Sequence, residues 1–202
     1  MKIIIASSKS QYKGDISGNY LYQPVNFFNS ASPNSLIKKY YSGSISDTLA
    51  PAYLRYTGII MKSFLSHSLD PAIIRLAEEL VLFSSPYYGV INFSQPISEY
   101  KINYNDKIEG KSIHSLWKNH FLGFSPNEEI IDLSTKQQAT YFQSKNTFRY
   151  ELDYSYIKSA HQGKVFKGEF LSALLIEILN NGAISEKFNE KFSKKIKVKT
   201  SY

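Results

Sequence analysis

Short segments typical of β-strands alternate along this chain with segments that have the apolar spacing of helices. Residues 2–7 are apolar and β-branched, which predicts a short buried strand. Alternating apolar and polar residues predict half-buried strands at 100–104 and 150–156, and short strands are also expected at 87–93 and 130–133. Asp70 is a capping residue and Pro71 fits the first helical position, so one helix is expected to begin there. Helices are expected over residues 71–83, 111–124, 135–145, 167–179 and 184–192. This order predicts an α+β (mixed α/β) fold, in which short strands are wrapped by helices.

The chain is interpreted as one domain that spans residues 1–202. Its 202 residues, 43% hydrophobic and 15% aromatic, supply enough apolar material for a sizeable core. No linker rich in Pro, Gly or Ser separates two apolar blocks. The end of the chain alternates Lys with Ile196 and Val198. This pattern is typical either of an edge strand protected by its lysines or of a flexible tail over 194–202.

Cysteine is absent, which excludes a disulfide scaffold, a thiolate zinc site, an iron–sulfur cluster and a cysteine nucleophile. His114 and His120 face different sides of an expected helix, and no carboxylate stands at a metal-ligand spacing with either, so we expect neither a metal site nor a cofactor. The apolar run at the N-terminus is too short for a signal peptide, and no segment approaches the ~20 apolar residues of a membrane span. We therefore expect a cytoplasmic protein without a membrane partner. The sequence leaves the oligomeric state open.

The positive charge gathers at the two ends of the sequence. The net charge is +7; residues 1–66 contribute +5, residues 67–157 contribute −3 and residues 158–202 contribute +5. If the basic ends meet in space, they form a cationic face that attracts polyanions. The alternative is a solvated lysine surface with no binding role.

Three segments carry side chains that suit phosphate binding or acid–base chemistry. Ser7-Ser8-Lys9-Ser10 follows the first strand, and strand ends are common positions for sites in α/β proteins; its Ser and Lys are a candidate nucleophile and base. An expected helix is preceded by Gly163-Lys164-Val165-Phe166-Lys167-Gly168, and backbone N–H groups at such a helix start can hold an anion. The alternative is a helix-starting loop whose exposed lysines have no binding role. Tyr100-Lys101 either stacks with bases and pairs with phosphates or belongs to an ordinary amphipathic strand.

These and other segments follow one another in the order of the motifs of a known family. Ile3-Ile4-Ile5-Ala6-Ser7-Ser8-Lys9-Ser10 is similar to a strand followed by S-P-A-K-T. Ser85-Pro86-Tyr87-Tyr88-Gly89-Val90-Ile91 is similar to S-G-L-Y-G-V-L, and Tyr100-Lys101 stands near the spacing of the Y-R pair that follows it. Further similarities are residues 52–58 to A-x-x-x-F-x-G, residues 110–117 to G-K-x-L-Y-x-F-W, residues 130–135 to V-I-N-L-A-S and residues 163–168 to A-K-K-A-R-G. On these motifs the chain resembles the peroxide stress protein YaaA family.

The resemblance implies a compact α/β fold with a positively charged cleft, DNA binding, and a role in limiting iron-driven oxidative damage under peroxide stress. It assigns DNA or phosphate binding to Lys9, Ser10, Tyr88, Gly89, Tyr100, Lys101, Lys164 and Lys167. The sequence departs from the family pattern where acidic residues are lost, at 59–61, 93–95 and 136–137, and where Lys101 and Lys167 replace arginines. Lysine keeps the charge and loses the bidentate fork, so the departures favour phosphate binding over catalysis.

The leading hypothesis is a YaaA-like protein that binds double-stranded DNA through a cationic cleft, by backbone or shape recognition. The alternative is an enzyme that acts on a phosphorylated or nucleotide-like small substrate in the same cleft, with Lys9 and Tyr100 as acid–base groups. A third interpretation is a diverged member of the family that acts through protein contacts. Lysines spread over an open groove favour DNA, whereas lysines that converge on a ligand-sized pocket favour the small substrate.

Overall fold

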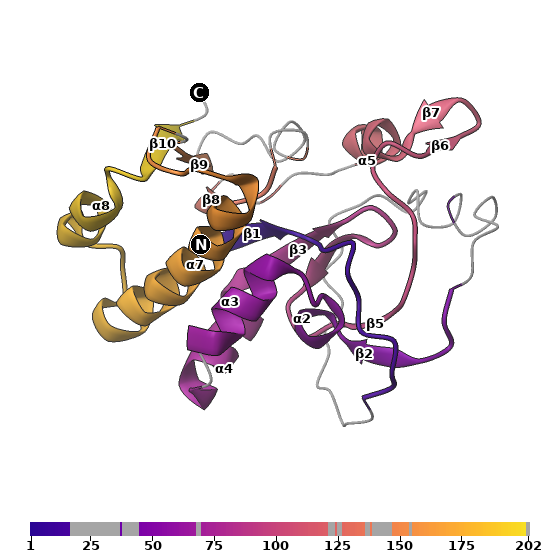
Figure 1. The fold of residues 1–202 in the computed structure, drawn as a ribbon, viewed down its shortest axis with the longest axis horizontal. Helices are drawn as coiled ribbons and strands as arrows, with labels where there is room; N and C mark the ends of the chain where they lie inside the picture. Colours follow the sequence, from indigo (N-terminus) through magenta and orange to yellow (C-terminus); the bar gives the residue numbers. More distant parts are fainter. Residues whose placement is uncertain are drawn as a thin grey trace.

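A six-stranded sheet runs through the centre of the molecule (Figure 1). The computed structural model describes residues 1–16, 37, 45–67, 70–120, 124, 127–135, 138, 147–153 and 155–200. The strands lie in the order β10-β9-β8-β1-β3-β4. Their bounds are Lys2–Ala6 for β1, Val81–Ser85 for β3, Gly89–Asn92 for β4, Ile130–Asp132 for β8, Thr147–Leu152 for β9 and Ile196–Thr200 for β10. Helices pack around this sheet, so the predicted mixed α/β class is confirmed.

β1 lies inside the sheet, as its apolar residues predict. The side chains of Ile3, Ile4 and Ile5 are fully or almost fully buried. β1 is parallel to β3 on one side and to β8 on the other, and β8 is parallel to β9. β4 and β10 are antiparallel to their neighbours and form the two edges. The four parallel strands therefore direct their carboxyl ends to the same edge of the sheet.

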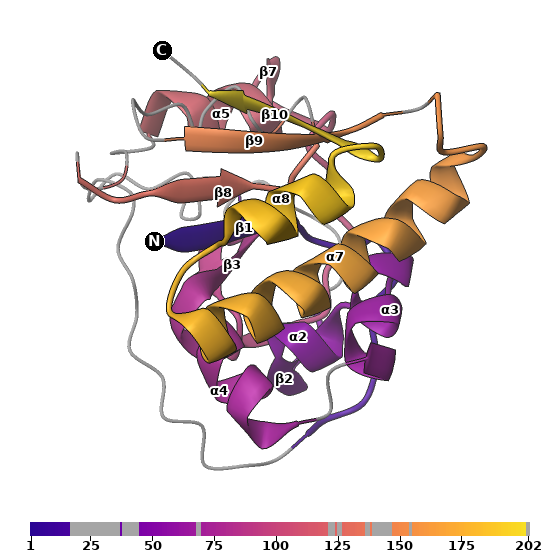
Figure 2. The same cartoon turned by 90° about the vertical axis from the view of Figure 1, so that its left-hand side faces the viewer.

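Three helices lie side by side against one face of the sheet (Figure 2). They are α3 (Ile59–His67), α4 (Pro71–Leu80) and α7 (Ala160–Asn181). α3 and α7 approach each other closely at Gly168, where an added Cβ would stand 2.4 Å from the carbonyl oxygen of Ile60. The Ser63 hydroxyl also donates a hydrogen bond to the Val165 carbonyl across this contact, at 2.9 Å. The residue without a side chain thus allows the two helix backbones to pack together.

The remaining elements are short. α2 (Ala52–Arg55) follows β2 (Leu49–Pro51), which pairs with β5 (Pro96–Ser98). β6 (Lys107–Ile108) and β7 (Lys111–Ser112) form a hairpin before α5 (Ile113–His120), and α8 (Glu186–Phe192) precedes β10. The buried indole of Trp117 on α5 donates a hydrogen bond to the Pro86 carbonyl at 2.8 Å, which ties α5 to the end of β3.

The helix predicted from Asp70 and Pro71 is present, and it is shorter than expected. The Asp70 side chain accepts a hydrogen bond from the backbone N–H of Ala72, which confirms the predicted cap. The helix ends at Leu80 rather than Phe83, and the next five residues are β3. All five residues of β3 are buried, and it begins with three apolar residues, Val81 to Phe83. A short apolar run of this kind cannot be distinguished from the end of a buried helix by its spacing, which is why the helix was expected to continue to Phe83.

Two other predictions differ from the structure: one strand is absent and one helix begins earlier than expected. The half-buried strand expected at 100–104 is wrong, because those residues form no strand. α7 begins at Ala160 rather than 167, and the Ser159 hydroxyl caps it by accepting a hydrogen bond from the Gln162 N–H. Gly163 to Gly168 therefore lie inside the helix and not in a loop that precedes it.

The C-terminal alternation of Lys with apolar residues forms an edge strand. β10 pairs with β9; Lys199 makes an ion pair with Glu151 on that strand, and Lys197 makes one with Asp153 just after it. The expected helix at 135–145 lies almost entirely outside the described residues. Within the described part of the chain, every helix is too short or too polar to cross a membrane.

Candidate functional site

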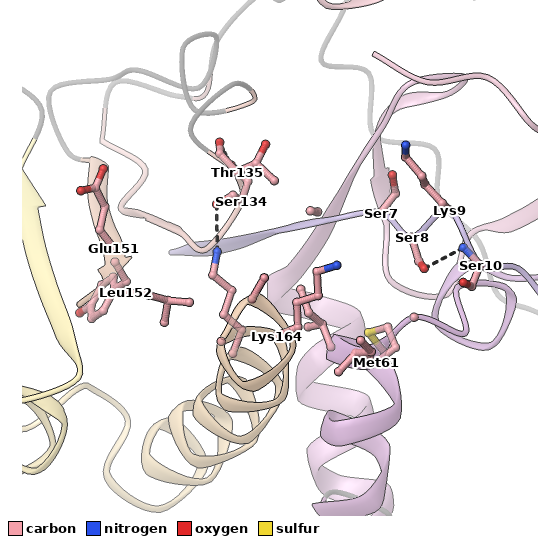
Figure 3. Close-up of a pocket in the computed structure, with 18 of the residues that line it drawn as sticks. Ser7, Ser8, Lys9, Ser10, Met61, Ser134, Thr135, Glu151, Leu152 and Lys164 are labelled. Atoms are coloured by element: carbon pink, nitrogen blue, oxygen red, sulfur yellow. Dashed lines mark hydrogen bonds between the residues drawn. The ribbon is translucent and has the colours of Figure 1, made fainter. Parts of the chain in front are cut away.

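A cavity of about 740 Å³ opens where the carboxyl ends of β1 and β8 lie side by side (Figure 3). The chain leaves β1 toward β3 on one side and later returns to β8 on the other side. The connections that follow β1 and β8 therefore diverge, and in open α/β sheets ligands bind in the crevice that such a divergence leaves. The volume is in the range of pockets for small molecules.

Residues 7–10, directly after β1, form one wall of the cavity. The N–H of Ser7 donates to the Ser84 carbonyl on β3, and the N–H of Ser10 donates to the Ser8 hydroxyl at 3.1 Å. Gly58, at the start of α3, faces this turn, and a Cβ there would stand 2.2 Å from the Ser8 hydroxyl oxygen. The absence of a side chain at Gly58 allows the serine-rich turn to pack against α3.

The first turns of α7 form the opposite wall, with Lys164 and Lys167 three residues apart on the same side of the helix. In Figure 3 the exposed Lys164 side chain extends toward the turn that holds Ser8 and Ser10. The half-buried Lys167 donates hydrogen bonds to the carbonyls of Leu133 and Ser134, at 2.5 and 3.1 Å. Burial lowers the pKa of Lys167 to about 8, with Arg149 adding to the effect and Asp132 opposing it.

β9 closes the cavity on a third side with a chain of ion pairs. The Arg149 guanidinium lies 2.6 Å from a carboxylate oxygen of Asp132 and 3.0 Å from one of Glu151. The other oxygen of Glu151 meets Lys199 of β10 at 2.6 Å. The hydrogen bond from Lys199 is the main reason that the pKa of Glu151 is lowered. The buried Asp132 also accepts the N–H of Ser134 at 2.8 Å and so fixes the turn after β8.

Three cavity lysines differ from Arg149 in their partners. Among the described residues, Lys9, Lys164 and Lys167 have no carboxylate oxygen within 4.0 Å, whereas Arg149 has two such neighbours. Within that part of the chain these three lysines therefore make no ion pair. Apolar side chains of α3 and β9, those of Ile59, Ile60, Met61 and Leu152, complete the lining. The cavity thus combines cationic groups, hydroxyls and an apolar surface, which suits an anionic ligand with an apolar portion.

Two buried tyrosines, Tyr56 and Tyr100, lie next to the end of β3. The Tyr100 hydroxyl lies 2.8 Å from that of Tyr56 and 2.9 Å from that of Ser85. Burial raises the pKa of Tyr100 to about 12, an effect that the hydrogen bonds from Ser85, Tyr56 and Ser7 partly offset. Burial likewise raises the pKa of Tyr56. Both phenols are neutral at physiological pH, and the Tyr100 hydroxyl connects Tyr56 to Ser85 at the end of β3.

The eight residues singled out from the sequence fall into two groups. Lys9, Ser10, Lys164 and Lys167 line the cavity. Four others lie outside its lining: Tyr88, whose hydroxyl accepts the N–H of Ser98; Gly89, with a φ of 78° at the start of β4; the buried Tyr100; and the exposed Lys101.

Sequence reasoning did not single out Arg149 and Glu151 as site residues. Both lie on β9, in a segment that was predicted as a strand from its alternating residues and given no binding role. Their register with β8 was the missing information, because Arg149 stands opposite Asp132 at the end of that strand. Among the described residues no group of three His, Cys, Asp or Glu side chains is arranged to hold a metal ion.

Segments that resemble family motifs converge on this cavity from four places in the sequence: Ser7–Ser10, Gly58, Ser134–Thr135 and Gly163–Lys167. The sequence model of the family described as peroxide stress protein YaaA matches residues 16–191 of the chain. Two UPF0246 proteins of Streptococcus agalactiae, from a serotype V strain and a serotype III strain, are each 26% identical to the chain over 101 residues. These alignments cover 48% of this chain and 42% of each relative, so the chain spans less than half the length of those relatives.

Proposed function

Because the chain belongs to the peroxide stress protein YaaA family, we propose that it acts in the oxidative-stress response by binding DNA through the cationic mouth of the cavity. The observation that carries the proposal is the convergence of Lys9, Lys164 and Lys167, from two distant parts of the chain, without carboxylates within 4.0 Å in its described part. Lys9 and Lys164 are exposed, so their ammonium groups can reach backbone phosphates outside the cavity. Contacts of this kind position a protein on DNA without reading its bases.

Protection against iron follows from the same contacts. DNA concentrates cations along its phosphates, and lysines that neutralise phosphates release those cations. A protein that covers a stretch of duplex in this way displaces ferrous ions from it, so that less iron reacts with peroxide next to the DNA. The protein itself needs no iron site for this role.

The test measures binding of the purified protein to a fluorescent duplex by anisotropy, across 50 to 200 mM salt. We expect the logarithm of the affinity to fall linearly with the logarithm of the salt concentration, with a slope of about −0.9 for each phosphate contact. Lys9→Glu and Lys164→Glu should each weaken binding and reduce the slope by at least about one. Lys107→Glu is the matched control, because Lys107 is an exposed lysine on the β6–β7 hairpin, outside the cavity lining.

The outcomes separate the possible contact surfaces. No binding at the lowest salt would refute the proposal, and so would equal losses in the Lys164→Glu and Lys107→Glu variants. Lys101→Glu tests how far the interface extends, since Lys101 is exposed and lies outside the cavity lining. A loss of affinity in that variant extends the DNA contact beyond the mouth, and unchanged affinity confines it to the cavity rim.

A further inference from the structure

The two ends of the cavity interior differ in chemistry, and contact with a DNA backbone would not use this difference. In Figure 3 the serine turn with Ser8 and Ser10 stands on one side, and Glu151 and Leu152 stand on the other. Lys164 of α7 lies between these sides and extends toward the serine turn, and Lys167 donates a hydrogen bond to the Ser134 carbonyl. The two ends of the cavity thus differ in chemistry: one offers hydroxyls and ammonium groups, and the other offers a carboxylate and an apolar side chain.

The first end suits a phosphate group. A phosphate monoester carries about two negative charges and three strong acceptor oxygens. The hydroxyls of Ser7, Ser8 and Ser10 and the ammonium groups of Lys9 and Lys164 can all donate to such oxygens. Lys167 has three N–H donors, of which two go to the carbonyls of Leu133 and Ser134, so one remains for a ligand.

The second end suits groups that donate hydrogen bonds. The Glu151 carboxylate is held in place by Arg149 and Lys199, with one oxygen directed to each, and every carboxylate oxygen can accept more than one hydrogen bond. In Figure 3 the exposed Thr135 lies beside Ser134; its hydroxyl donates to the Gln138 amide oxygen, accepts the Gln138 N–H and can accept one further hydrogen bond. Ile60, Met61 and Leu152 supply an apolar surface between the polar groups.

We propose that this cavity binds a small phosphate monoester of nucleotide size, with its phosphate at the serine turn and Lys164 and its hydroxyl or amino groups at Glu151 and Thr135. A nucleoside monophosphate has this combination of groups: a phosphate, a flat apolar base, and donors on the sugar and base. The proposed nucleotide site uses the same lysines as the proposed DNA interface. It rests on the proposed function only through these shared lysines. The carboxylate end distinguishes it from a surface that holds polyanions by charge alone.

The experiment is isothermal titration calorimetry of the full chain with the four ribonucleoside monophosphates, adenosine and inorganic phosphate, at constant ionic strength. We expect at least one monophosphate to bind at least about tenfold more tightly than inorganic phosphate, and adenosine to bind more weakly than that monophosphate. Lys164→Ala should weaken both the monophosphate and inorganic phosphate. Glu151→Gln should weaken the monophosphate about tenfold and leave inorganic phosphate unchanged.

Glu151 belongs to an ion-pair chain, so Thr135→Val is a second variant of nearly the same shape that leaves that chain intact. It should also weaken the monophosphate selectively. The inference is overturned if no monophosphate binds more tightly than inorganic phosphate, or if both variants bind the monophosphate as well as the unaltered protein does. Duplex binding is measured on the same samples: duplex binding without nucleotide binding refutes this inference alone, and nucleotide binding without duplex binding refutes the DNA proposal alone.

Discussion

Replacement of Gly168 by alanine tests the contact between α3 and α7, the two helices that line the cavity. A Cβ at position 168 would stand 2.4 Å from the Ile60 carbonyl oxygen, 2.6 Å from the Ser63 Cβ and 2.8 Å from the Phe64 backbone nitrogen. Favourable contacts between heavy atoms lie near 3.5–4.0 Å, so the helices have to separate by about 1 Å. Two of the three neighbours are backbone atoms, so a change of rotamer cannot relieve the overlap.

The expected magnitude follows from two opposed effects. Overpacking of a core contact costs about 1–3 kcal/mol, and more where backbone has to move. Alanine favours a helix over glycine by about 1 kcal/mol. The overlap involves three atoms at once, which places its cost at or above the upper end of that range. We therefore expect a net loss of about 2 kcal/mol in the free energy of unfolding. For a chain of this length this lowers Tm by about 4–8 °C.

The assay is thermal unfolding followed by circular dichroism, with Glu169→Ala as the matched control. Glu169 is the exposed next residue of α7, and its replacement should change the free energy of unfolding by less than about 0.5 kcal/mol. Since α3 and α7 both line the cavity, Gly168→Ala should also weaken the binding of phosphate-bearing ligands. A Gly168→Ala variant that melts at or above the temperature of the unaltered protein would refute the close packing of these helices.

Three further predictions concern single side chains. Asp70→Ala removes the cap of α4 and should cost about 1 kcal/mol in urea unfolding, whereas Asp70→Asn should retain most of it; equal losses in both would contradict the capping role. Arg149→Met leaves the buried Asp132 carboxylate without its ion-pair partner and should cost about 3 kcal/mol, and partial recovery is expected on adding Asp132→Asn; no loss in the single variant would exclude a structural role for the pair. The pKa of Lys167 falls from 10.5 to about 8 on folding, so the unfolded chain binds more protons between these values and stability rises with pH across that window, by at most about 1.4 kcal/mol per pH unit. Lys167→Met should remove this contribution from the pH profile, and superimposable profiles would show that the pKa of Lys167 is not lowered.

Local chemistry made several elements predictable from the sequence. The strand at residues 2–7 was recognisable because three isoleucines in a row suit a strand that is buried on both faces, and Ile3 to Ile5 are buried. The start of α4 was recognisable because Asp70 and Pro71 have distinct physical roles at a helix N-terminus. Both signals act within a few residues, so they need no knowledge of the tertiary structure.

Elements defined by distant contacts were not predictable in the same way. Tyr100 alternates with polar neighbours, as a residue in a half-buried strand does. Its hydroxyl, however, bonds those of Tyr56 and Ser85, two residues that are distant from it in the sequence. The start of α7 was placed too late because Gly163 and Gly168 suggest a loop. In the structure Gly168 is helical and is needed for the approach of α3. For the candidate site, the sequence indicated Lys9 and Lys164, whereas the role of Arg149 depends on the register of β9 against β8.

Arg149 and Lys167 have different partners in the wall of the cavity. A guanidinium presents its donors in a planar fork, so it can satisfy Asp132 and Glu151 at the same time. Those carboxylates are then occupied by Arg149, and by Lys199 in the case of Glu151. Lys167 binds instead to the carbonyls of Leu133 and Ser134 and holds the turn that carries Thr135 against the cavity. Lys167 thus fixes this turn and keeps one N–H donor for a ligand.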